Sequence, residues 1–213
     1  MENILVVGAT GTTGRKVVSL LKSSPYFEPI AMVRKESQIR EFSDQGIQTV
    51  IGDLEKNISH IMDAIDVDKV VFAAGSGGKK VVEVDQEGAK KMIDASKIHN
   101  IKKFVMLSSM GAEHPEEATE LKDYLKAKHN ADEYLKASNI RYTIVRPGSL
   151  TNDKGIGKIS VGQPLNEQGS ISREDVAHVL TKTLHEDAAS NDCFEIVSGN
   201  QLIENALADL ANS

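Results

Sequence analysis

Three glycines spaced G-x-x-G-x-x-G constrain the fold of this chain more than any other feature. Gly8, Gly11 and Gly14 follow the apolar run 4–7 and precede a helix-like pattern that begins near Lys16. A strand, a glycine turn and a helix in this order place unpaired N–H groups and the positive end of a helix dipole at the turn. The motif predicts a site for the diphosphate of a dinucleotide. The alternative is a structural turn that only packs the helix on the strand.

The size and charge of the chain limit what can surround this turn. Its 213 residues suit one α/β domain with a sizeable core, and we expect a single domain over residues 1–213. A net charge of −6 argues against a nucleic-acid surface. The lone Cys193 excludes an internal disulfide, and no stretch approaches the roughly 18 apolar residues of a membrane span or a targeting segment. We therefore expect a cytoplasmic protein with a small-molecule substrate and neither nucleic-acid nor membrane partners.

Strand-like and helix-like stretches alternate along the chain, which predicts a Rossmann-type doubly wound parallel sheet with helices on both faces. Residues 151–213 are expected to add a small loop, a helix, a strand and a final helix on the substrate side. The irregular stretch at 151–169 within them is expected to form a loop or hairpin over the site. Ser172 is the expected N-cap of the first of these helices. The expected strands are 4–7, 29–33, 48–51, 69–74, 103–107, 142–145 and 193–197, and the other helices lie near 36–44, 57–65, 81–98, 116–137 and 201–210.

The residues after the second strand indicate which dinucleotide binds. In such folds the side chain at the carboxyl end of this strand meets the adenosine ribose, and an acid there favours NAD. Arg34 and Lys35 occupy this place, so a 2′-phosphate, and hence NADP(H), is expected. Two solvated loop cations are the alternative. Asp53, at the end of the third strand, could accept a hydrogen bond from the adenine amino group or cap the following helix.

Small residues follow the fourth strand. Ala73, Ala74 and Gly75 would let the backbone pass close to a ribose, although the glycines of this segment also suit a flexible loop.

One pair of side chains suggests catalysis. Tyr124 and Lys128 are four residues apart and share a face of the predicted helix, where a lysine favours the ionised form of a neighbouring phenol. Lys128 falls within an apolar stripe, so it needs a polar partner such as a cofactor ribose. The same spacing also occurs on ordinary helices. The stripe comprises Leu121, Leu125, Ala131 and Leu135.

Ser108 and Ser109 stand at the end of the fifth strand, where a hydroxyl could hold a carbonyl oxygen, or the two serines could simply begin a loop. The six histidines show no metal-ligand spacing, so no metal is expected.

In combination, these motifs resemble those of atypical, single-domain short-chain dehydrogenases/reductases, in particular the NmrA-like and biliverdin-reductase-B-like group. The resemblance covers nearly the whole chain and rests on residues 8–14, 104–111, 124–128, 142–148 and 172–177. It implies that Ser109, Tyr124 and Lys128 are the active-site serine, tyrosine and lysine, and that Lys128 also binds the nicotinamide ribose. Asp85 stands where related reductases usually have asparagine, and we include it in the catalytic set. The cofactor-binding set comprises Gly8, Thr10, Gly11, Thr12, Thr13, Gly14, Arg34, Lys35, Asp53, Leu54, Ala73, Ala74, Gly75, Lys128, Pro147 and Gly148.

The resemblance implies an NADP(H)-dependent oxidoreductase that reduces a small carbonyl-, quinone- or flavin-like acceptor by hydride transfer. The short region after Gly148 disfavours large sugar nucleotides. Asp85 and this short region also fit a second class, a non-catalytic NADP-binding redox sensor that presents a surface to a protein partner. An epimerase or dehydratase with a tightly held cofactor would use the same residues.

Overall fold

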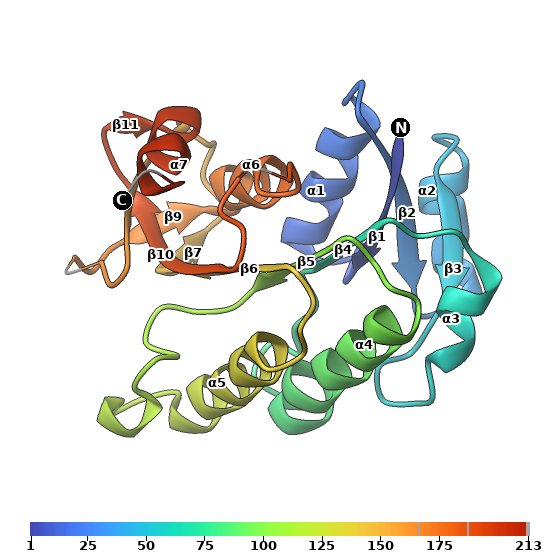
Figure 1. Ribbon diagram of the computed structural model, residues 1–213, viewed down its shortest axis with the longest axis horizontal. Coiled ribbons are helices and arrows are strands. Elements are labelled where there is room, and N and C mark those ends of the chain that lie inside the picture. The colour runs from blue at the N-terminus through green and yellow to red at the C-terminus, as the bar shows by residue number, and fades with distance from the viewer. Residues whose placement is uncertain (166, 187, 212–213) are drawn as a thin grey trace.

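The computed structural model describes residues 1–165, 167–186 and 188–211 (Figure 1). The strands are β1 (Glu2–Val7), β2 (Phe27–Val33), β3 (Gln48–Ile51), β4 (Lys69–Phe72), β5 (Lys103–Leu107), β6 (Tyr142–Pro147), β7 (Ser149–Thr151), β8 (Lys158–Gly162), β9 (Ser170–Ser172), β10 (Asp192–Ser198) and β11 (Gln201–Leu202). The α-helices are α1 (Thr12–Lys22), α2 (Ile39–Ser43), α3 (Ser59–Ala64), α4 (Glu87–Ile98), α5 (Lys122–Lys136), α6 (Arg173–Lys182) and α7 (Ile203–Ala211). Shorter turns are η1 (Glu36–Gln38), η2 (Val81–Gln86), which is a π-helix, and η3 (Pro115–Glu117).

The central sheet confirms the predicted doubly wound architecture. Its order is β11-β8-β10-β6-β5-β4-β1-β2-β3, and the seven strands from β10 to β3 run parallel. Strand β1 lies between β2 and β4. The chain runs from β1 to β2 and β3 on one side of β1 and then crosses to β4 on the other side, so the strand order reverses at β1. A ligand crevice is expected at the carboxyl ends of the strands at such a point.

Alternate residues along the central strands pack into two separate hydrophobic cores, one on each face of the sheet, because successive side chains of a strand point to opposite faces. Ile4 and Val6 of β1 pack on the face covered by α1, α2, α6 and α7, whereas Leu5 and Val7 pack on the face covered by α3, α4 and α5. In Figure 1, α4 and α5 lie below the sheet and α1 and α6 above it. The central strands β1, β2, β4, β5 and β6 are therefore largely buried on both sides, which explains their mostly apolar sequences.

The region after β6 differs from the sequence-based expectation of a loop or hairpin over the site. Residues 158–162 form β8, which pairs antiparallel with β10 and extends the sheet. β7 and β9 make a small second sheet. Among the helices that the structure describes, none is long and apolar enough to cross a membrane.

A cluster of charged side chains lies at the amino-terminal ends of β1, β4 and β5. The buried Lys69 ammonium lies 2.6 Å from Glu2 Oε2 and donates to the carbonyl of Leu184, two residues after α6 (2.9 Å). Lys102 Nζ lies 3.0 Å from Glu2 Oε1 and 2.8 Å from Asp68 Oδ1. Burial alone would raise the pKa of Glu2, but hydrogen bonds from Lys69 and Lys102 outweigh it and lower this pKa. The pKa of Asp68 is lowered against burial in the same way by Lys102.

These lowered pKa values predict an acid-sensitive contribution to stability. It is fully present above the unfolded-state pKa values of about 4 and is lost as the pH falls through the lower folded-state values. The urea midpoint should therefore fall as the pH drops below about 4. Lys102→Met should make the free energy of unfolding less dependent on pH in this range. The change should be about 1 kcal/mol or less, because Lys102 is half exposed. The exposed Lys97→Met variant is the control, and identical pH profiles for the two variants would contradict the assignment.

Candidate functional site

A cleft of about 700 Å³ opens at the carboxyl ends of the parallel strands. Its walls come from the segments that follow β1, β2, β3, β4 and β5, together with η2, α5, β7 and α6. This volume lies within the range of small-molecule and cofactor sites. The cleft thus forms where the strand order predicts a ligand, beside the glycine turn.

The glycine turn forms one end of the cleft. Gly8 has φ +89°, and a Cβ there would lie 2.6 Å from Ala74 Cα. A Cβ on Gly14 would lie 2.1 Å from the Gly8 carbonyl oxygen, so Gly14 allows α1 to pack directly on the turn. The motif therefore brings a helix start, a strand end and the loop after β4 closer together than side chains would permit.

The amino terminus of α1 suits an anion. Its N-cap residue is Gly11, so no side chain caps the helix, and its first turn contains no acid. The N–H groups of the first turn have no partner within the helix, and the helix dipole adds partial positive charge there. Thr10, Gly11, Thr12 and Thr13 all line the cleft. These groups fit the diphosphate of a dinucleotide.

The residues expected around the adenosine also line the cleft. Arg34 follows β2, and its exposed guanidinium lies 3.9 Å from Glu55 Oε1. Asp53 and Leu54 follow β3 and form the neighbouring wall. The Asp53 carboxylate accepts a hydrogen bond from the Glu55 N–H (3.1 Å), and the N-cap residue of α3 is Ile58. The helix-capping alternative for Asp53 was therefore wrong.

Lys128 lines the cleft and is buried, with 4% of its surface exposed. Its ammonium lies 3.3 Å from Asp85 Oδ1, donates to the Leu107 carbonyl (3.3 Å) and sits 5.7 Å from the centre of the Tyr124 ring. Tyr124 also lines the cleft. The structure thus brings together the pair predicted from the four-residue spacing. It supplies Lys128 with Asp85 and a carbonyl as polar partners.

Asp85 holds two segments of the cleft in place. It is 1% exposed, its Oδ1 faces Lys128, and its Oδ2 accepts a hydrogen bond from the Ser76 N–H (3.0 Å). Ser76 belongs to the loop that follows Ala73, Ala74 and Gly75, all of which line the cleft. Asp85 Oδ1 accepts no hydrogen bond from the residues that the structure describes. This side chain therefore links α5 to the loop after β4.

Several predicted site residues stand apart from the cleft. In the described part of the chain, its lining omits Gly14, Lys35, Ser109, Pro147 and Gly148. The Ser109 hydroxyl donates to the Met110 carbonyl (3.2 Å), whereas its neighbour Ser108 does line the cleft. Gly148 is needed elsewhere, because a Cβ on it would lie 2.3 Å from the Gly169 carbonyl oxygen. The catalytic role of Ser109 stays a prediction.

Helix α5 begins later than the sequence predicted. Leu121 has φ +57° and precedes the helix, and its side chain is 69% exposed at the rim of the cleft. Its place in the apolar stripe was therefore wrong. Leu125, Ala131 and Leu135 are buried as predicted.

A buried polar network that was not predicted from the sequence lies beside the Tyr124–Lys128 pair. The fully buried Asp132 accepts a hydrogen bond from the Ser108 hydroxyl (2.8 Å) and one from Arg146 Nε (3.0 Å). Arg146 also forms an ion pair with Glu113. Burial raises the pKa of Asp132, although Arg146 and Ser108 oppose it. Burial would lower the pKa of Arg146, but the Asp132 carboxylate outweighs it and raises this pKa.

The sequence contained two signals of this network, a four-residue spacing on α5 and a charged residue in β6. Asp132 follows Lys128 by four residues and therefore lies on the same helix face. Arg146 is a charged residue within a mostly apolar strand. Arg173, at the start of α6, lines the cleft and was not predicted as a site residue either. The sequence marked this position only as part of a capped helix start, and that cap is confirmed by the hydrogen bond from the Asp175 N–H to the Ser172 hydroxyl (2.9 Å).

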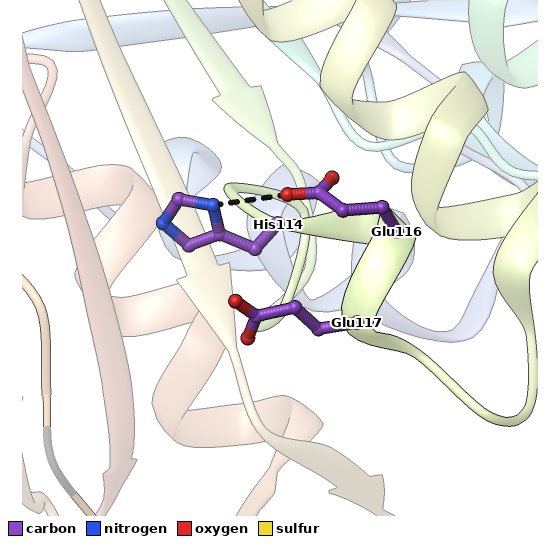
Figure 2. A group of neighbouring side chains, drawn as sticks. All are labelled: His114, Glu116 and Glu117. Carbon is purple, nitrogen blue, oxygen red and sulfur yellow. Dashed lines mark hydrogen bonds and ion pairs between the residues drawn. The ribbon is translucent and has the colours of Figure 1, made fainter.

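One group of side chains has ligand atoms close enough to approach a metal ion. His114, which precedes η3, gathers with Glu116 and Glu117 of η3, and His114 Nδ1 lies 3.3 Å from Glu116 Oε1 (Figure 2). All three are exposed, and exposed carboxylates commonly gather without an ion. We assign no metal to this group.

Comparisons with known proteins agree with this geometry. Residues 8–187 match a family described as NAD(P)H-binding. The chain is 40% identical over 213 residues to YhfK of Bacillus subtilis, an uncharacterized sugar epimerase, covering 97% of this chain and 99% of that protein. It is 28% identical to sanguinarine reductase of Eschscholzia californica, covering 97% and 92% of the two chains. The crystal structure of the oxidoreductase ylbE from Lactococcus lactis superposes with a TM-score of 0.89 at 29% identity, covering 99% and 97%.

Proposed function

Since the chain belongs to the NAD(P)H-binding family of Rossmann-fold oxidoreductases, we propose that it is an NADP(H)-dependent reductase that transfers hydride to a small carbonyl-, quinone- or flavin-like acceptor. The observation that carries this proposal is the Tyr124 and Lys128 pair, with its buried ammonium, on one wall of the cleft. A relative that aligns over almost the whole chain carries the name of a reductase, which supports the same class.

The described residues fit this cofactor. The uncapped amino terminus of α1 would hold the diphosphate, and Gly8 leaves room for its approach. Arg34 would hold the 2′-phosphate of NADP, because its guanidinium can form two parallel hydrogen bonds to a phosphate. Glu55, at 3.9 Å, is its nearest acidic partner and makes no hydrogen bond with it. We therefore propose that NADP(H) is preferred over NAD(H).

The reduced nicotinamide, when bound, supplies the hydride. Tyr124 donates the matching proton to the acceptor oxygen, so that a carbonyl becomes an alcohol. The Lys128 ammonium stabilises the phenolate that remains. Asp85 and the Leu107 carbonyl hold this ammonium in place beneath the phenol ring. The phenolate recovers its proton from water, because the cleft is open.

One observation favours a second candidate. The Asp85 carboxylate pairs with the lysine that would otherwise assist Tyr124, which suits a non-catalytic NADP-binding sensor. The relative named as a sugar epimerase favours a third candidate, an epimerase or dehydratase with a tightly held cofactor.

A substrate panel separates these candidates. NADPH oxidation is measured with aldehydes, quinones and flavins, and NADPH binding is titrated in parallel. The reductase proposal expects at least one acceptor to be turned over. Tight NADPH binding without turnover of any acceptor would favour the sensor.

The cofactor preference has its own test in Arg34→Glu. Hydrogen bonds to charged groups contribute about 1.5–3 kcal/mol, so NADPH affinity should fall about ten-fold or more while NADH affinity changes little. Binding is measured by fluorescence titration. Arg40→Glu, an exposed arginine of α2, is the control. Equal losses for the two cofactors would rule out a 2′-phosphate contact.

A further inference from the structure

Among the residues that the structure describes, three cationic side chains line the cleft, and they differ in how their charge is balanced. Arg34 lies near Glu55, and Lys128 pairs with Asp85. Arg173 also lines the cleft, yet it forms no ion pair with any carboxylate in the described part of the chain. A partly buried cation without an acidic partner in a protein of net charge −6 calls for a partner from outside the chain.

The Arg173 guanidinium is held by only one of its nitrogens. Nη1 donates to the Leu150 carbonyl (3.2 Å) and to Asn152 Oδ1 (2.9 Å). Nε and Nη2 have no hydrogen-bond partner among the described residues. These two nitrogens form one edge of the guanidinium, the edge that can donate two parallel hydrogen bonds to a carboxylate or phosphate.

The acids next to Arg173 are already engaged elsewhere. Glu174 accepts a hydrogen bond from the Gly155 N–H and lies 3.8 Å from Lys16. The buried Asp175 accepts hydrogen bonds from the N–H groups of residues 156 and 157, and from the Ser172 hydroxyl. These bonds fix the start of α6 to the segment after β7. Arg173 is thus held in position before any ligand arrives, which lowers the entropic cost of binding.

We propose that Arg173 is an anion-binding residue of the cleft and that its free edge binds an oxyanion, either a phosphate or a carboxylate-like group. Two oxyanions are candidates for this contact with Arg173. One is the diphosphate of the cofactor, because α6 packs beside α1, whose amino terminus lines the same cleft. The other is an acidic group on the acceptor, because Leu150 and Arg173 form the wall that follows β6. The acceptor source rests on the proposed reductase function.

The experiment compares wild type with Arg173→Gln, which removes the charge, and Arg173→Lys, which keeps the charge but loses the two-pronged edge. NADPH is titrated by fluorescence. The protein saturated with NADP⁺ is then titrated with 1,4-naphthoquinone-2-sulfonate and with the neutral 1,4-naphthoquinone. Binding to the oxidised form needs no turnover. Arg141→Gln is the control, since Arg141 is exposed and pairs with Glu186 outside the cleft.

Arg173→Gln should weaken one anion by about ten- to a hundred-fold, with a smaller loss for Arg173→Lys. A loss confined to NADPH identifies the diphosphate as the partner, and a loss confined to the sulfonate identifies the acceptor. Unchanged binding of both would overturn the proposal. If the wild type binds the sulfonate through Arg173 but reduces no acceptor, the reductase function fails and the anion site stands. Thermal unfolding checks each variant, and Arg173→Lys keeps the test valid if Arg173→Gln does not fold.

Discussion

Tyr124→Phe is expected to lower turnover about 10²- to 10⁴-fold, the usual contribution of a positioned general acid, while NADPH affinity stays unchanged. The variant keeps the aromatic ring that lies over Lys128 and removes only the hydroxyl that would supply the proton. Lys128 also keeps Asp85 and the Leu107 carbonyl as partners, so the wall of the cleft should retain its shape. The loss should therefore fall on kcat, as measured by NADPH oxidation with the best acceptor of the panel.

The same helix offers a matched control. Tyr134 lies on α5, and its hydroxyl donates to Asp94 Oδ1 (2.7 Å) away from the cleft. Tyr134→Phe makes the same chemical change and should leave kcat unchanged. Equal activity of Tyr124→Phe and wild type would exclude Tyr124 as the proton donor. Loss of NADPH binding together with turnover would instead assign Tyr124 to the cofactor site.

The parts of the fold that the sequence predicted are those encoded by neighbouring residues. The glycine turn, the apolar strand at 4–7 and the Ser172 cap are local features, and all three are present. The Tyr124–Lys128 pair also succeeded, because a spacing of four residues fixes two side chains on one helix face. Strand β8 was missed because it is partly exposed and its sequence is not continuously apolar, and it is held in place by pairing with β10 and β11, which follow it in the chain.

The parts of the site that were missed depend on distant residues. Leu121 fits the apolar period of α5, but the backbone turns into the left-handed region at that residue, so its side chain points out of the core. Asp132 and Arg146 are 14 residues apart and meet only because α5 packs on β6. Likewise, Arg173 reaches the cleft only because α6 lies beside α1. Contacts of this kind depend on the order of the strands in the sheet, and local sequence patterns do not encode that order.

Arg146→Met is expected to cost about 3–5 kcal/mol of stability at pH 8, because it leaves the buried Asp132 carboxylate without a balancing charge. Methionine has a similar length, so little of the loss should come from packing. Arg141→Met, at an exposed position just before β6, should cost about 1 kcal/mol or less. Urea unfolding gives both values. Equal losses for the two variants would show that Asp132 does not depend on Arg146.

The pH dependence of this variant distinguishes charge from packing. Burial already raises the pKa of Asp132, and removing Arg146 removes the main group that opposes the rise. An acid whose pKa is raised by folding loses stability as the pH climbs from its unfolded-state pKa to its folded-state pKa. The cost of Arg146→Met should therefore be smaller at pH 5 than at pH 8. Adding Asp132→Asn should recover most of it at pH 8, since the amide oxygen can still accept from Ser108 and no buried charge remains. A cost that neither low pH nor the second substitution reduces would mean that Arg146 acts through packing alone.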